Sequence, residues 1–152
     1  MKRDKLATAV WVRLARAYGL TLREIRRRMT HLDLTLPQFD VVAQLARDSD
    51  GMTAGDLSRA MLVTAGNVTG IIARLSARGI VERTRDPNDA RVVRLRLSPA
   101  GRRIALREIA KEEHQLGEIF ARLNPATFQR VIDALDTLRH AVDDSDASED
   151  VK

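Results

Sequence analysis

Cysteine is absent from the 152 residues of this chain, and histidine is scarce. Without thiols the chain can form no disulfide, cannot hold zinc through cysteine and cannot sense oxidants through a thiol. The three histidines, His31, His114 and His140, are too few and too scattered to predict a metal site. We therefore expect neither a metal nor a cofactor.

Long apolar runs and catalytic motifs are missing as well. No stretch approaches the roughly 18 apolar residues of a membrane-spanning helix, and no signal-peptide core is present. We therefore expect a cytoplasmic location and no membrane contact. The chain has no phosphate-binding glycine loop, no HExxH pair and no nucleophile elbow. The nearest polar pair, His31 and Asp33, is spaced so that the two side chains do not share a helix face, which disfavours an enzyme.

Aromatic residues make up only 3% of the chain, although 44% of it is hydrophobic. A core must therefore be built from Leu, Ile, Val and Ala, which suits packing between helices. The length fits one domain, or one small domain with an added interaction element.

Acidic residues are few in the middle of the chain. The net charge is +5, and residues 51–97 hold eight arginines against four acidic residues. Residues 143–152, by contrast, hold five acidic residues against Lys152. The concentrated positive charge predicts an anionic partner such as nucleic acid, and the acidic end is typical of a solvated tail.

Three Ser, Thr or Asn residues stand one or two positions before a proline, which is typical of a helix start. On this basis helices begin near residues 36, 99 and 125. Apolar residues recur at helical spacing before the first of these starts and in two stretches after the second. Thr53 and Thr64 are placed to cap two shorter helices, and Gly79 is placed to end the second of them.

The apolar period changes from helical to alternating between residues 80 and 97. Val93, Leu95 and Leu97 alternate with arginines, which predicts a half-buried strand with a charged outer face, and residues 80–84 form its partner. Two short helices followed by a two-stranded hairpin make a winged helix-turn-helix. The predicted fold is therefore mainly α with a small β-hairpin wing.

The helix from Thr64 to Arg78 has the composition of a DNA-reading helix. Its outward- or sideways-facing residues are Ala65, Gly66, Asn67, Thr69, Gly70, Ala73 and Arg74. Small residues let the helix axis approach base edges, while Asn67 can pair with adenine, Thr69 can reach a phosphate or a thymine methyl and Arg74 suits a phosphate. The free N–H groups at the Thr64 end can hold a further phosphate. The alternative is a plain surface helix, in which two glycines would cost about 1 kcal/mol each relative to alanine.

The hairpin tip has the sequence Asp-Pro-Asn-Asp-Ala-Arg over residues 86–91. Arg91 fits the narrow minor groove, and Asp89 can hold the loop by pairing with an arginine or capping a loop N–H. Arg94 can reach the phosphate backbone from the outer face of the strand. The alternative is a solvated hairpin with weak surface ion pairs, but beside the preceding helix the loop is better interpreted as a wing.

The order and spacing of these motifs resemble the MarR family of bacterial transcriptional regulators. The matching segments are Leu34–Phe39, Thr53–Ser58, Val63–Gly70, Arg78–Val81, Asp86–Arg91 and Leu97–Gly101. The resemblance implies a homodimer that reads a pseudo-palindromic operator, with residues 64–74 as the base-contacting helix and Arg91 as the wing arginine. Many members carry basic or hydroxyl side chains where this chain has Ala65, Gly66 and Gly70, so the wing and DNA shape are expected to carry more of the recognition here.

The resemblance also implies a division into domains. The winged helix-turn-helix covers residues 35–98, a helical dimerisation region covers 1–34 and 99–143, and the acidic disordered tail covers 144–152. The terminal helices carry apolar stripes remote in sequence from the winged core, which would be unusual on a monomer. A two-fold dimer would bury these stripes and set the two recognition helices about one DNA turn apart.

Family members commonly release DNA when a small aromatic anion binds, so an effector site is expected. Residues 2–31 hold nine basic residues against two acidic ones. Trp11 could stack on such a ligand, Arg16 could hold its carboxylate, and Tyr18 lies on the same helix face as Trp11. Arg26 and Arg27 could hold the phosphates of an aryl-CoA effector. The alternative is that Trp11 and Tyr18 belong to the dimer core and that the arginines are solvated.

The sequence therefore predicts a transcriptional regulator, expected to be a repressor, that binds a double-stranded operator as a homodimer. A small aromatic acid or aryl-CoA compound is the expected effector. Two alternatives stay open, namely a non-specific architectural DNA-binding protein and, less favoured, a small helical enzyme.

Overall fold

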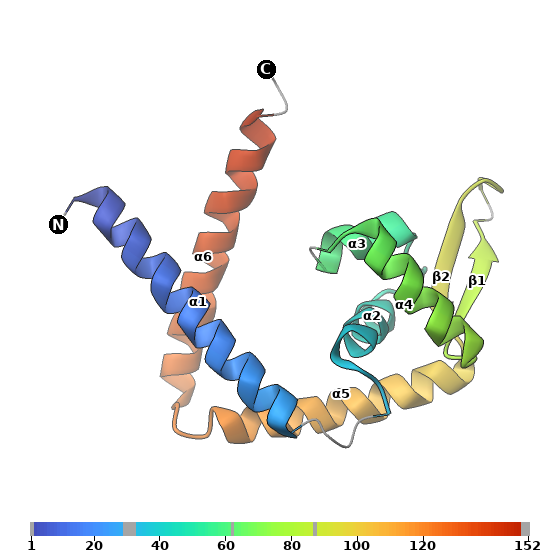
Figure 1. Cartoon of the computed structure of the whole chain (residues 1–152), viewed down its shortest axis with the longest axis horizontal. Helices are drawn as coiled ribbons and strands as arrows, with labels where there is room; N and C mark the ends of the chain where they lie inside the picture. Colours follow the sequence, from blue (N-terminus) through green and yellow to red (C-terminus); the bar gives the residue numbers. More distant parts are fainter. Residues whose placement is uncertain (1, 29–32, 62, 87, 150–152) are drawn as a thin grey trace. The chain divides into compact units, whose positions relative to one another are not determined.

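The computed structural model describes residues 2–28, 33–61, 63–86 and 88–149, with only the backbone of Ala65 and of residues 144–149. The elements in chain order are α1 (Arg3–Arg28), α2 (Leu36–Arg47), α3 (Ala54–Met61), α4 (Ala65–Ala77), β1 (Val81–Arg85), β2 (Val93–Leu97), α5 (Pro99–Ile119) and α6 (Pro125–Glu149) (Figure 1). Two compact units, Met1–Leu116 and Gly117–Lys152, make up the chain. The expected class, helical with one two-stranded hairpin, is confirmed.

The helices α2, α5 and α6 begin at their expected positions. Before α5, the Ser98 hydroxyl accepts a hydrogen bond from the Gly101 N–H at 2.9 Å and donates one to the Gly79 carbonyl at 2.6 Å. A Cβ atom at Gly101 would lie 2.0 Å from the Ile80 carbonyl oxygen, so only glycine fits there. These contacts attach the start of α5 to the segment that joins α4 to β1.

The helices α2, α3 and α4 surround the core of the winged region. In α4, Val68, Ile72 and Leu75 are buried, which confirms the expected apolar stripe, and α4 ends at Gly79 with φ +66°. The buried apolar side chains are Leu34, Phe39, Val41, Val42, Leu45, Leu57, Val68, Ile72, Leu75, Ile80, Val81, Leu95 and Ala105. One core therefore serves residues 34–105, and it includes the first turns of α5, which the sequence assigned to the dimerisation region.

The wing is an antiparallel hairpin in which Val81 stands opposite Leu97 and Arg85 stands opposite Val93. Leu95 is buried as expected, but Val93 is 46% exposed. Because Val93 lies at the tip end of β2, it extends past the core that covers Leu95. A separate bridge pairs Leu95 with Met52, in the turn between α2 and α3.

The long terminal helices have little core of their own. None of the described side chains of α1 is buried, and Trp11 and Tyr18 are 68% and 66% exposed. In the second unit, Phe128 packs edge-on against Phe120 with ring centroids 6.3 Å apart. The exposed apolar residues of α6 are Phe128, Val131, Ile132, Leu135 and Val142. No single helix in the described part of the chain is both long and apolar enough to cross a bilayer.

The C-terminal end differs from the expected disordered tail. The backbone of α6 stays helical as far as Glu149, so residues 144–149 continue the helix, and residues 150–152 lie outside the described part. Adding a residue to an existing helix costs much less free energy than starting a new helix, so α6 can extend into the acidic stretch. The charge pattern of the sequence does not show where such an extension ends.

Candidate nucleic-acid interface

Helix α4 exposes a face that has almost no side chains. With about 3.6 residues per turn, Gly66, Gly70, Ala73 and Ala77 lie on the side of the helix opposite its buried stripe. A Cβ atom at Gly66 or Gly70 would meet nothing within 4 Å. No contact inside the described chain therefore requires either glycine, and the backbone of α4 is open to close approach by a partner.

Polar side chains stand on the two flanks of this face. Asn67 and Arg74 line one flank, beside a pocket of about 510 Å³ between α4 and the first turn of α2. Thr69 lies on the other flank, toward the wing. All three are exposed, so the structure places them on the surface of α4 beside its open backbone. Their contacts with DNA stay predictions.

The N-terminus of α4 begins after Thr64. The N–H groups of Asn67 and Val68 donate to the Thr64 carbonyl at 3.1 and 3.3 Å, while the Thr64 hydroxyl makes no capping hydrogen bond. The side-chain cap predicted for Thr64 is therefore not formed, and these two bonds are the first hydrogen bonds of the helix itself. The side chain of Ala65, a predicted contact, lies outside the described residues.

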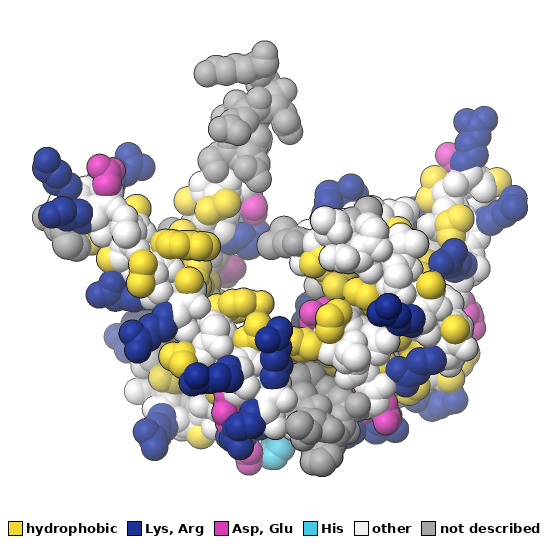
Figure 2. Space-filling model, viewed as in Figure 1, with side chains coloured by type: hydrophobic (Ala, Val, Ile, Leu, Met, Phe, Trp, Pro, Cys, Tyr) yellow, Lys and Arg dark blue, Asp and Glu magenta, His cyan; other side chains and the backbone are white. Residues whose placement is uncertain are grey.

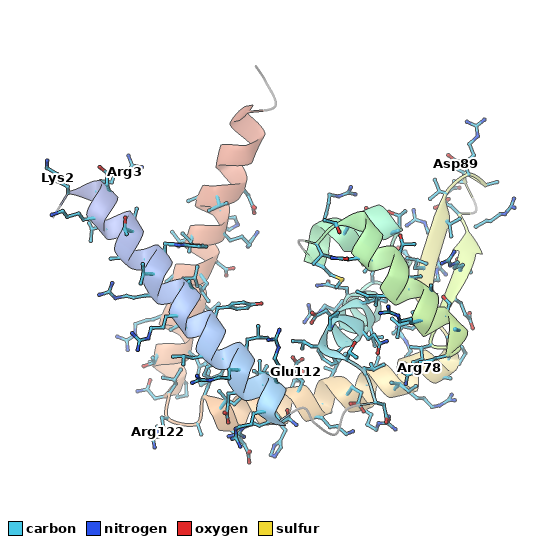
Figure 3. The ribbon with its side chains drawn as sticks, viewed as in Figure 1. Lys2, Arg3, Arg78, Asp89, Glu112 and Arg122 are labelled. Atoms are coloured by element: carbon cyan, nitrogen blue, oxygen red, sulfur yellow. The ribbon has the colours of Figure 1, made fainter. Side chains whose placement is uncertain are left out.

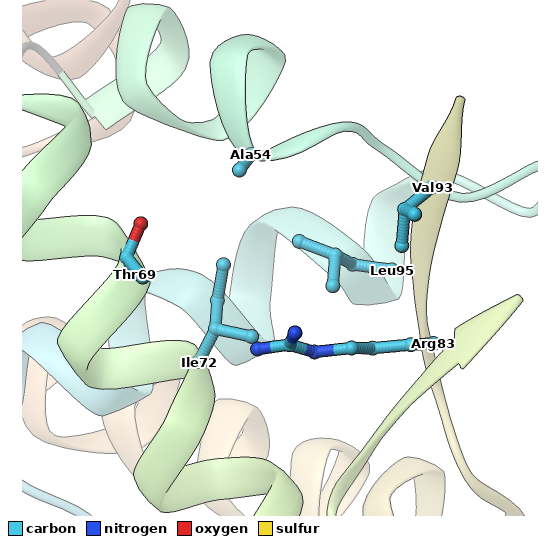
Figure 4. A pocket seen from close by; sticks show the side chains of 6 residues that line it. All are labelled: Ala54, Thr69, Ile72, Arg83, Val93 and Leu95. Carbon is cyan, nitrogen blue, oxygen red and sulfur yellow. The ribbon is translucent and has the colours of Figure 1, made fainter. Parts of the chain in front are cut away.

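A second pocket, of about 180 Å³, lies between α4 and the wing. Its lining residues are Ala54, Thr69, Ile72, Arg83, Val93 and Leu95. Figure 4 shows the Arg83 side chain extending from β1 toward Ile72, across the space between the two elements. Sequence reasoning missed Arg83 as a candidate contact. Arg83 lies two residues after Val81, so the two side chains share the inner face of β1. Only the tertiary arrangement brings Arg83 beside α4.

The wing loop is closed by two aspartates. The Asp86 carboxylate accepts hydrogen bonds from the N–H groups of Asn88 and Asp89 at 2.8 and 3.3 Å. The Asp89 carboxylate accepts one from the Arg91 N–H at 2.9 Å, which confirms that Asp89 caps a loop N–H. Figure 3 shows Asp89 at the outer end of the wing. The loop thus presents Arg91 from a backbone that its own carboxylates hold in shape.

Arg94 is paired within the chain. Its Nε donates to Asp86, and its Nη1 donates to the Gly51 carbonyl at 2.9 Å. Hydrogen bonding from the Arg94 guanidinium, reinforced by the Asn88 N–H, lowers the pKa of Asp86. Arg94 is adjacent to the buried Leu95 in β2 and so projects to the other face of the strand, but its Nε and Nη1 already donate to groups within the chain. A contact between Arg94 and a DNA phosphate stays a prediction.

The arginines of the winged region divide into paired and unpaired groups. Arg59 pairs with Asp56 at 2.5 Å, and Arg96 donates to the Asp50 carbonyl at 3.0 and 2.6 Å. Within the described residues, no ion pair or side-chain hydrogen bond is found for Arg47, Arg74, Arg78, Arg83, Arg85 and Arg91. Figure 2 shows Lys and Arg side chains spread over the visible side of the wing and its neighbouring helices. The unpaired arginines are the ones available to an external anion.

The residues predicted to bind an effector lie on α1. Trp11, Tyr18, Arg16 and Arg26 are exposed, and the described pockets of the winged region are lined by other residues. Arg27 donates to Glu24 at 2.9 and 2.6 Å. Hydrogen bonds from Arg27 and Arg28 lower the pKa of Glu24 to about 2. Arg27 is therefore already paired within α1.

A third pocket, of about 290 Å³, holds two carboxylates, Asp40 from α2 and Glu112 from α5, and Arg47. Desolvation and the negative charge of Asp40 raise the pKa of Glu112, while Arg47 opposes the shift. Among residues 2–28, 33–61, 63–86 and 88–149, no group of three or more His, Asp or Glu side chains is placed to hold a metal ion. His31 lies outside these ranges.

Comparison with known proteins points to one family. Residues 32–92, which include α2, α3, α4, β1 and most of the wing loop, match the model of the MarR family. The chain is 37% identical over 95 residues to the uncharacterized HTH-type transcriptional regulator YsmB of Bacillus subtilis, covering 62% of this chain and 64% of that protein. The chain thus matches slightly less than two thirds of this relative's length.

Solved structures extend the similarity beyond the winged region. A MarR family protein from Bacillus stearothermophilus is 26% identical, with a TM-score of 0.71, and the match covers 93% of this chain and 98% of that chain. BpsR of Bordetella bronchiseptica, whose DNA binding is regulated by 6-hydroxynicotinic acid, is 29% identical with a TM-score of 0.73, covering 86% and 92%. The terminal helices therefore belong to the shared fold as well.

Proposed function

We propose that the chain is a member of the MarR family and acts as a sequence-specific DNA-binding transcriptional regulator, because residues 32–92 match the model of that family and a MarR family protein from Bacillus stearothermophilus has a similar fold. The observation that carries the proposal is the pairing of two exposed elements in one small unit. Helix α4 offers an open backbone with Asn67 and Thr69 on its flanks, and the wing offers Arg91 beside it. The relatives are regulators, which argues against an enzyme at the level of the family.

Binding is proposed to use a different groove for each element. Helix α4 enters the major groove, where Asn67 pairs with an adenine and Thr69 contacts a phosphate or a thymine methyl. Arg74, on the same flank as Asn67, contacts a phosphate. The wing follows the backbone to the adjacent minor groove, where Arg91 responds to the stronger negative potential of A·T-rich sequence. Base readout therefore rests on few side chains, and DNA shape supplies the rest.

We propose that the active form is a homodimer. The exposed apolar residues of α1 and α6 would have no reason to stay in water on a monomer. Two-fold pairing would bury them and set two α4 helices about one DNA turn apart, which matches a pseudo-palindromic operator. This role is assigned to residues 1–34 and 99–143, with the winged region at 35–98.

We propose that a small aromatic acid or its thioester releases the operator, so that the protein acts as a repressor in the cytoplasm. The regulation of BpsR by 6-hydroxynicotinic acid supports this class of effector. Trp11, Tyr18 and Arg16 are the proposed stacking and carboxylate contacts. An aryl-CoA phosphate on Arg26 and Arg27 would have to displace Glu24 from Arg27.

The test is binding to duplexes selected from a random pool by the protein itself. A regulator should prefer its selected site over random duplex by roughly a thousandfold or more at physiological salt. Equal affinity for every duplex would instead indicate an architectural DNA-binding protein. Aromatic acids and their thioesters would then be titrated against the selected complex, and release by none of them would remove the effector from the proposal.

A further inference from the structure

Asp86 uses its two carboxylate oxygens for two different tasks. Oδ1 accepts the N–H groups of Asn88 and Asp89 and so closes the wing loop, while Oδ2 accepts Nε of Arg94 on the opposite strand. The Asp86 side chain is only 8% exposed. One nearly buried carboxylate therefore ties the shape of the loop to strand β2.

Arg94 carries this connection out of the wing. While Nε bonds to Asp86, Nη1 donates to the Gly51 carbonyl at 2.9 Å, in the turn between α2 and α3. A planar guanidinium fixes the angle between its donors, so the two bonds together fix the direction of the side chain. A continuous path of charge-assisted hydrogen bonds thus runs from the wing loop to the helix-turn-helix.

The turn that receives Arg94 is itself constrained. The Asp48 carboxylate accepts the N–H groups of Asp50 and Gly51 at 2.8 and 3.0 Å. Gly51 has φ +80°, and a Cβ atom there would lie 2.6 Å from Cγ of Arg96. Only glycine fits this conformation and this spacing, so the Gly51 carbonyl is held as a fixed acceptor.

Strand β2 is also attached to this turn nearer its base. Met52 and Leu95 exchange backbone hydrogen bonds of 3.1 and 2.8 Å, and Arg96 donates to the Asp50 carbonyl. These bonds hold the base of the wing. The Arg94–Asp86 pair extends the attachment to the start of the loop that carries Arg91.

We propose that Asp86 and Arg94 form a strut that sets the position of the wing, and that Arg94 serves DNA binding as a positioning residue for Arg91. The proposal rests on the proposed DNA-binding function and deepens it. Arg91 has no side-chain partner within the described residues, so the loop backbone alone decides where its guanidinium stands. The strut decides where the loop stands.

The strut and simple electrostatics predict opposite changes in DNA affinity when the negative charge of Asp86 is removed. Asp86 is a negative charge on the element that approaches DNA, so removing it should strengthen binding if charge alone mattered. If Asp86 positions the wing, removing its charge should weaken binding. Asp86→Asn keeps an oxygen for the loop N–H groups while it removes the ion pair with Arg94.

The experiment measures dissociation constants for a duplex selected by the wild-type protein from a random pool. Asp86→Asn should weaken binding by about tenfold, the loss expected for one charged hydrogen bond. Glu82→Gln is the matched control, because Glu82 is an exposed carboxylate on β1 with no partner in the described part of the chain. It should bind equally well or more tightly. Tighter binding by Asp86→Asn would overturn the strut.

A double-mutant cycle separates positioning from direct contact. In an Arg91→Ala background, Arg94→Ala should weaken DNA binding little further, because the loop that Arg94 positions no longer carries the Arg91 side chain. Additive losses would show that Arg94 contacts DNA independently. Arg94→Lys keeps the charge but not the two-directional fork, so it should bind as poorly as Arg94→Ala, and rescue by lysine would also count against the strut.

The strut can fail separately from the proposed function. If the wild-type protein bound all duplexes equally, sequence-specific regulation would fail and the strut would be judged by amide hydrogen exchange. Asp86 N–H donates to Val92 O, and Val92 N–H donates to Asp89 O, both at 2.9 Å. Faster exchange of these two amides in Arg94→Lys than in wild type is the expected result. Unchanged exchange would overturn the strut whatever the DNA result.

Discussion

The winged region buries its apolar residues, whereas the two long terminal helices leave theirs exposed. Residues 34–105 bury thirteen apolar side chains in one core, whereas none of the described side chains of α1 is buried and α6 keeps five large apolar residues exposed. The winged region therefore has its own core, whereas the apolar residues of α1 and α6 are left exposed. Every predicted DNA contact lies in the winged region, and in the proposed dimer the terminal helices would set the distance between two such regions.

The largest effect is expected from a charge placed on the apolar stripe of α6. Leu135→Glu should prevent dimer formation, because an unpaired buried charge costs about 3–5 kcal/mol, and operator affinity should fall with it. Sedimentation velocity at micromolar concentration measures the assembly state.

Thr137→Glu is the matched control for this charge. Thr137 is an exposed residue on the opposite side of α6, so the same substitution there should leave the dimer intact. A Leu135→Glu protein that stays dimeric would remove the proposed role of α6.

The second largest effect is expected from a cavity in the winged core, and the dependence of its stability loss on protein concentration distinguishes this core from a dimer interface. Leu57 is fully buried in the winged core, so Leu57→Ala should reduce the free energy of unfolding by about 2–5 kcal/mol. Because this core lies within one chain, the loss should not depend on protein concentration, unlike a loss at a dimer interface. Thermal unfolding at two protein concentrations tests this.

A smaller effect is expected on base readout. Asn67→Ala should cost roughly 1–3 kcal/mol at one base pair per half-site and relax the preference there. Arg74→Ala should instead weaken binding to all sequences and reduce the salt slope by about one per subunit. Affinities for a panel of single-base operator variants distinguish the two, and a change of base preference in Arg74→Ala would contradict this division of contacts.

The smallest effect concerns pH. Desolvation, together with the charge of Asp40, raises the pKa of Glu112 in the folded protein, so the folded state holds a proton there more tightly than the unfolded state. The ionised form therefore opposes folding above the folded-state pKa, and the penalty disappears as pH falls below the unfolded value. Glu112→Gln should raise the melting temperature at pH 7 and lose that advantage in acid. The exposed Glu113→Gln should show no such pattern.

Much of the fold could be predicted because local rules decide it. Hydroxyl or amide caps followed by proline located the starts of α2, α5 and α6, and the positive φ of Gly79 ended α4 as expected. The alternation of residues 93–97 predicted β2 and the burial of Leu95. These features depend on residues that are close together in the sequence, and a single sequence contains that information directly.

The sequence did not show the contacts between residues that are distant in sequence. Alternation placed Arg94 on the face of β2 opposite the buried Leu95, but it could not show that the Arg94 guanidinium pairs with Asp86 and with the Gly51 carbonyl. Arg83 was overlooked because its place beside α4 depends on how the wing packs. Helix α6 continues past the start of the acidic stretch because a helix already formed propagates easily. The hydrophobic periodicity of the sequence shows neither these long-range contacts nor the end of α6.

The bare face of α4 has a consequence for how this protein could acquire a new target. A helix surface made of Gly66, Gly70, Ala73 and Ala77 carries almost no information about the bases below it. In the proposed binding mode, a larger residue at either glycine would strengthen the helix by up to about 1 kcal/mol but would hold its backbone farther from the bases. A change of target at this face would therefore exchange close backbone approach for side-chain readout, and it would alter the contacts of Asn67 and Thr69 as well.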